Sequence, residues 1–105
     1  MEHLTISSID LIDDHITIVF KNHWFQEDIH TLRQILLEQI PNHQIKETTL
    51  GADRESIRLL WLDAELMLNF DYYSQSCWFS AHNEMSTSKI LPLFTALSKN
   101  LEHHV

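Results

Sequence analysis

The chain has 105 residues, of which 44% are hydrophobic, and its 7 basic and 15 acidic side chains give a formal net charge of -8. This length and composition predict a single globular domain over residues 1–105. The acidic charge argues against binding to nucleic acid or to an anionic membrane surface, and it is compatible with a basic protein partner. One cysteine cannot form an internal disulfide, and no basic, apolar leader is evident, so we expect a cytoplasmic protein.

The first part of the chain predicts a β-hairpin and then a helix. Residues 4–9 and 15–20 are expected strands, with Leu4 and Ile6 on one face of the first, and Asp13-Asp14 is the expected turn. Apolar residues then recur at helical spacing, namely Phe25, Ile29, Leu32, Leu36 and Ile40. Asn22 is the expected N-cap, and Pro41 should end this helix.

Four strands are expected next. Residues 43–50 are polar and predict an edge strand or a strand with one face in water, after which Gly51 marks a positive φ or a bulge. The following strand is apolar on both faces and predicts a central position or cover on both sides; the faces are Ile57, Leu59 and Trp61 against Arg58, Leu60 and Leu62. The last two strands alternate cleanly, with Leu66, Leu68, Phe70 and Tyr72 in one and Cys77, Phe79 and Ala81 in the other.

The turns between these strands are expected at Asp63-Ala64 and at residues 73–75. Because alanine disfavours positive φ, we do not expect the first turn to be an ideal two-residue hairpin.

The end of the chain predicts a second helix. Its apolar stripe consists of Ile90, Phe94, Leu97 and Leu101, with Leu93 beside it. Ser86 or Ser88 is the expected cap, and Pro92 fits only in the first turn. The resulting order β-β-α-β-β-β-β-α predicts an α+β two-layer domain, in which two helices pack on a mainly antiparallel sheet.

Two polar stretches are candidate binding residues. Asp53 and Arg54 follow the glycine, and the arginine fork suits a carboxylate or a phosphate, although polar residues are also ordinary in turns. The run from Asp71 to Trp78 combines hydroxyls, a carboxylate and aromatic rings, which are common both in binding surfaces and in sheet-edge packing. The predicted binding residues are therefore Asp53, Arg54, Asp71, Tyr72, Tyr73 and Trp78.

Signals for catalysis, cofactors and metals are weak. A single glycine is incompatible with the glycine-rich phosphate and dinucleotide loops. Cys77 has no neighbouring base and is expected to be a buried apolar residue. The eight histidines include no H-x-x-x-H pair, although His103-His104 could bind metal adventitiously. We therefore expect no cofactor and no specific metal site. These residues also argue against an enzymatic function, without deciding the question.

Two motifs carry a resemblance to a known family: G-A-D-R at Gly51–Arg54 and L-x-L-N-F-D-Y-Y-S-x-S-C-W at Leu66–Trp78. Over residues 51–78 the chain resembles a family of small uncharacterised gammaproteobacterial proteins that form a domain of unknown function. It departs from that family at Glu55-Ser56, where an aromatic residue or histidine is common, and at Asp63-Ala64, where a glycine is common. The resemblance implies a cytoplasmic bacterial protein and no particular activity.

The expected function is that of a non-catalytic protein-binding or adaptor domain. A variant is an immunity-like protein that neutralises a basic toxin. The alternative is a small-molecule-binding protein or small enzyme with Arg54 and Asp71 in a pocket. A third possibility is a homodimer formed through the sheet edge near Ile45.

Overall fold

The computed structural model describes residues 5–102, without the side chains of residues 101 and 102. Its strands are β1 (Ile6–Ile12), β2 (His15–Phe20), β3 (Gln44–Leu50), β4 (Arg54–Trp61), β5 (Ala64–Asp71) and β6 (Ser76–Ala81). Its helices are α1 (Ile29–Leu37), preceded by the 3-10 turn η1 (Gln26–Asp28), and α2 (Ile90–Glu102), preceded by η2 (Glu84–Lys89). Leu4, where the first strand was expected to begin, and His103-His104 lie outside the described residues.

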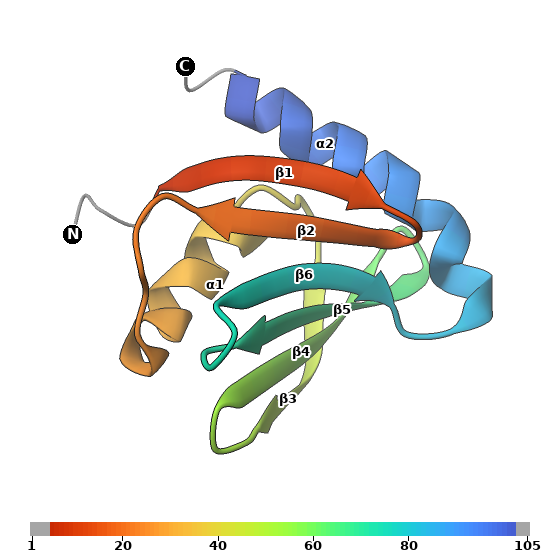
Figure 1. The fold of residues 1–105 in the computed structure, drawn as a ribbon. Helices are drawn as coiled ribbons and strands as arrows, with labels where there is room; N and C mark the ends of the chain where they lie inside the picture. The colour runs from red at the N-terminus through yellow and green to blue at the C-terminus, as the bar shows by residue number, and fades with distance from the viewer. Residues whose placement is uncertain (1–4, 103–105) are drawn as a thin grey trace.

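The six strands form one antiparallel sheet in the order β1-β2-β6-β5-β4-β3 (Figure 1). The two helices pack on it, so the predicted α+β fold is confirmed. β3 lies at one edge of the sheet, as its polar sequence predicted. β1 lies at the other edge, where α2 packs against it.

The core lies between the helices and one face of the sheet, here called the helix face. Alternate residues of each inner strand point into it and are almost fully buried, for example Ile18, Leu59, Leu68 and Phe79. The helices contribute Ile29, Leu32, Leu36 and Leu37 from α1, and Ile90, Leu93 and Leu97 from α2. The alternation of apolar and polar residues along these strands therefore reflects burial on one side of the sheet. The opposite side of the sheet, here called the open face, has no second layer within residues 5–102.

The open face decides between the two predictions for β4, a central position or cover on both sides. The strand is internal, between β3 and β5, but it is not covered on both sides. Arg58 and Leu60 on its open face are half-buried, and Leu62, which follows the strand, is 56% exposed. Its apolar second face is thus shielded only by neighbouring side chains on the sheet.

The turn after β4 also differs from its prediction. Trp61 pairs with Ala64, and Leu62 and Asp63 form a two-residue connection with φ of 50° and 65°. Positive φ at both central positions is the geometry of a type I′ hairpin. Ala64 belongs to the strand, because it is buried beside Trp61 on the helix face, and Leu62 instead adopts the left-handed conformation.

Two helix caps were predicted incorrectly, although α2 begins at Ile90 and keeps Pro92 in its first turn, as predicted. The backbone is extended at Phe25, whose N–H donates to Asp28 Oδ2 at 2.8 Å, so the first turn begins there and not at Asn22. Phe25 is 51% exposed, and Trp24 is buried in its place. Before α2, the cap is Asn83, whose side chain accepts a hydrogen bond from Ser86 N.

Gly51 does not have the role predicted for it. It has no positive φ, and the bulge in β3 lies at Lys46, between the paired residues Ile45 and Glu47. A Cβ atom at Gly51 would lie 3.5 Å from Arg54 O, which is ordinary van der Waals contact. The backbone therefore does not require glycine at this position.

Candidate functional site

Three connections meet at one end of the sheet. They are residues 21–25 after β2, residues 51–53 between β3 and β4, and residues 72–75 between β5 and β6. Tyr72 N donates to Asp53 O at 2.8 Å, which joins two of these connections. The side chain of Gln75 joins the third, since its Nε2 donates to Trp24 O at 2.8 Å and its Oε1 accepts from Trp24 N at 3.1 Å. The three loops thus hold one another in place.

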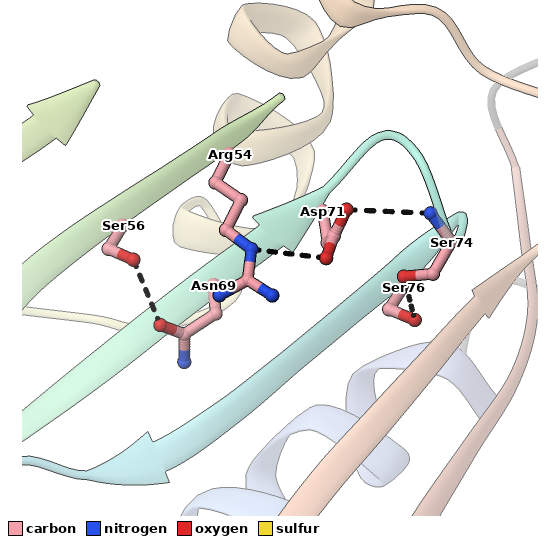
Figure 2. A network of polar contacts seen from close by, with 6 residues as sticks. All are labelled: Arg54, Ser56, Asn69, Asp71, Ser74 and Ser76. Atoms are coloured by element: carbon pink, nitrogen blue, oxygen red, sulfur yellow. Dashed lines mark hydrogen bonds and ion pairs between the residues drawn. The ribbon is translucent and has the colours of Figure 1, made fainter. Parts of the chain in front are cut away.

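The antiparallel register brings Arg54 and Asp71 together. They are directly opposite each other on β4 and β5, and Arg54 Nε lies 3.2 Å from Asp71 Oδ2 (Figure 2). The Asp71 side chain is only 13% exposed, and its Oδ1 also accepts a hydrogen bond from Ser74 N. This carboxylate therefore fixes both the turn and the arginine. The Arg54 side chain is 72% exposed, so its terminal Nη donors face solvent.

Aromatic rings lie at this end of the sheet in two groups. Tyr73 is 86% exposed and lines a shallow hollow of about 330 Å³ together with residues 51–54 and Asp71. Tyr72 is half-buried and contacts Phe25 and His23 in a cluster with ring centroids 4.9–6.4 Å apart. We call the set His23, Phe25, Asp53, Arg54, Asp71, Tyr72 and Tyr73 the hairpin-end surface.

Of the six residues predicted to bind, five lie at this end of the sheet: Asp53, Arg54, Asp71 and Tyr73 line one hollow, and Tyr72 lies in the ring cluster with His23 and Phe25. Trp78 is the exception, because it lies further along the open face, opposite Asn69 of β5. There Asn69 accepts a hydrogen bond from Ser56 (Figure 2). Its side-chain nitrogen also donates to Trp78 O and to Ser80. This polar network is half-buried and internally satisfied, so it stabilises the sheet and presents few free groups.

The sequence reading missed His23, Phe25 and Gln75. The first two belong to the run His23-Trp24-Phe25, which three successive rings make conspicuous in the sequence. Helical spacing assigned Phe25 to the core instead. No sequence signal identifies Gln75, because its two bonds to Trp24 span 51 positions along the chain.

Cys77 is fully buried on the helix face, and this burial raises the pKa of its thiol far above the ordinary value. A thiol in this state is a poor nucleophile. Among residues 5–102, no group of three or more His, Cys, Asp or Glu side chains is placed to hold a metal ion. Nor does either helix of the described chain have the length and apolar character needed to cross a membrane.

The chain belongs to the family described as Protein of unknown function (DUF3630), whose model matches residues 6–99. The match covers nearly all of the fold described above, from β1 to α2, and it confirms the resemblance to a domain of unknown function. No curated protein and no solved structure matches the chain.

Proposed function

We propose that this protein is a non-catalytic protein-binding domain and that the hairpin-end surface is its recognition site. The observation that carries this proposal is an exposed arginine at the start of β4 beside exposed rings on loops that hydrogen bonds fix. Arg54 is 72% exposed in its side chain, Tyr73 is 86% exposed and Phe25 is 51% exposed. Tyrosine and arginine are enriched among the residues that dominate the energy of protein interfaces.

Rigid presentation supports this function. Binding costs about 0.5–1.5 kcal/mol for each flexible side chain that becomes ordered, and preorganised groups avoid part of that cost. Arg54 is held by Asp71, and the Tyr72 ring packs against His23, Trp24 and Phe25. The hairpin-end surface is therefore shaped before a partner arrives.

The charge of the chain indicates the kind of partner. A net charge of -8 would speed association with a basic protein through long-range attraction. At the contact itself, the free Nη donors of Arg54 suit a carboxylate on that partner. A basic toxin neutralised by an immunity-like protein is one partner of this type. We place this interaction in a reducing bacterial cytoplasm, with which the single buried thiol of Cys77 is compatible.

The test is affinity capture from the native lysate, comparing the wild type with Arg54→Ala/Tyr73→Ala. Both side chains are exposed, so the double variant should fold normally, which circular dichroism will check. A matched control is Met85→Ala/Lys99→Ala, which removes an exposed apolar and an exposed basic side chain elsewhere. We expect a partner that the control retains and the double variant loses. Equal capture by all three proteins would contradict the proposal.

A second candidate is the binding of a small anionic ligand, because Arg54 and Asp71 do share one hollow. The hollow is wide open to solvent, whereas small-molecule sites usually enclose most of their ligand. A thermal-shift screen of small carboxylates and phosphates distinguishes the two functions. A rise in melting temperature that Arg54→Ala abolishes would favour the ligand, and no rise would favour the protein partner.

A further inference from the structure

The two edges of the sheet are exposed to very different degrees. At the β1 edge, α2 packs against the strand (Figure 1). At the β3 edge, all seven residues from Gln44 to Leu50 are exposed, and within residues 5–102 no further strand lies beyond them. An uncovered edge strand can pair with another strand, and natural proteins usually prevent this.

The backbone groups of β3 that are free for pairing can be identified. Gly51 N donates to Arg54 O at 2.7 Å, and hydrogen-bonded pairs alternate along an antiparallel ladder from that point. Thr48 and Leu50 fall at the non-bonded positions opposite Ile57 and Glu55. Their N–H and C=O groups therefore point away from β4, toward the free edge.

A hollow lies beside this edge on the helix face. It has a volume of about 400 Å³, lies between α1 and β3, and has mainly apolar walls that include Leu37 and Ile45. At the other end of the same strand, Leu50 is 72% exposed. Leu50 also belongs to the helix face, because it pairs with Glu55, which bonds to Arg33 of α1 at 3.0 Å. The strand β3 thus has the exposed side chain of Leu50 at one end and borders the apolar hollow at the other.

We propose that two copies of this chain pair through their β3 strands to form a continuous antiparallel sheet. The twofold axis passes through Thr48, which faces Thr48 of the second copy and exchanges both backbone hydrogen bonds with it. In this register Leu50 lies opposite Lys46 of the second copy, next to that copy's Ile45 and the hollow. Each copy therefore covers the exposed leucine of the other.

Charge and geometry select this register. An axis through Lys46 or Glu47 would place like charges directly opposite each other, which destabilises a strand pair. Glu47 and Thr49 also point their backbone groups toward β4 and are not free to pair. An axis through Leu50 would pair only the last residues of the strand. With the axis at Thr48, Glu47 faces Thr49 of the second copy, and no acidic pair forms.

The test is sedimentation equilibrium over a range of protein concentrations. We expect a monomer–dimer equilibrium for the wild type, and a dimer dissociation constant raised at least about tenfold in Leu50→Asp, since about 1.4 kcal/mol gives a factor of ten. Thr48→Pro should also dissociate the dimer, because proline removes an N–H that faces outward and spares the bonds to β4. Leu91→Asp is the matched control, as Leu91 is 58% exposed on α2.

The register has its own test. Opposed Cα atoms in a hydrogen-bonded antiparallel pair lie about 5.5 Å apart, which suits a disulfide. Because Cys77 is buried, Thr48→Cys supplies the accessible thiol and should give a disulfide-linked dimer on mild oxidation. Gln44→Cys, which is also exposed but does not face its own copy in this register, should not. A wild type that stays monomeric, or a dimer that survives both Thr48→Pro and Leu50→Asp, would overturn the proposal.

Discussion

The two faces of β5 carry alternate residues of one strand and have different physical roles. On the helix face Ala64, Leu66, Leu68 and Phe70 are at most 3% exposed and belong to the core cluster that includes residues of both helices. On the open face Glu65, Met67, Asn69 and Asp71 are half-buried, and the three polar ones are bonded to neighbouring strands. The comparison indicates that the helix face supplies the apolar burial that holds the domain together. The open face can carry polar groups, and with them the arginine of the hairpin-end surface.

The largest expected effect comes from truncating one apolar side chain of similar size on each face of β5 and comparing the loss of stability. Leu68→Ala should lower the free energy of unfolding by about 2–5 kcal/mol, because it opens a cavity in a fully buried site. Met67→Ala, the adjacent residue on the open face, should lower it by only about 1 kcal/mol, since water and flexible neighbours fill the space. Urea unfolding followed by tryptophan fluorescence measures both. Equal losses would show that the open face is covered in solution.

A smaller effect should appear at high pH on the helix face. Burial raises the pKa of the Cys77 thiol, so the folded state keeps its proton after the unfolded state has lost it. The thiol is neutral in both states below pH about 9, its ordinary pKa, and there it adds no pH dependence. Above that pH, stability should fall by about 1.4 kcal/mol per pH unit until the folded-state pKa is reached.

The measurement for Cys77 is the slope of unfolding free energy against pH in the alkaline range. Other groups titrate there as well, so the informative quantity is the difference between the wild type and Cys77→Ala. The variant should be less stable at neutral pH but should lose stability more slowly as the pH rises. Parallel slopes would mean that the thiol reaches solvent.

The smallest effect is expected at the turn that joins the two inner strands β4 and β5. Leu62 has a φ of 50°, a conformation that costs a residue of this type about 1–2 kcal/mol. Leu62→Asn should therefore raise the melting temperature, with a gain of up to about 1 kcal/mol, since asparagine favours this turn type. The control is Leu91→Asn, an exposed leucine in α2, which should give no gain. A loss at Leu62 would show that its side chain shields the open face.

Much of the fold followed from periodicity in the sequence. Alternation in β2, β5 and β6 predicted those strands and their buried residues, because a sheet covered on one side imposes a period of two. The apolar stripes at helical spacing predicted α1 and α2, because each helix also buries only one side. Their first turns could not be read in this way, since Asp28 and Asn83 fix them through individual side-chain bonds.

The candidate site was only partly visible in the sequence. Arg54 and Asp71 were predicted as binding residues, but their pairing depends on the register of β4 and β5, which the Leu62-Asp63 turn sets. Phe25 joined the surface because Trp24 took the buried position that helical spacing had assigned to Phe25. Which of two neighbouring aromatic residues is buried depends on the shape of the core, and the spacing in the sequence does not give that shape.

The sequence by itself determined the class of fold, the acidic charge and most of the buried residues, because local periodicity and composition encode them. Only the tertiary structure decided which loops meet at the hairpin-end surface and that α2 packs at the β1 edge of the sheet and not at the β3 edge. Both depend on contacts between residues far apart in the chain, such as Gln75 with Trp24 and α2 with β1. The energies of such contacts depend on distances and orientations in the folded chain, which the local sequence pattern around each residue does not specify.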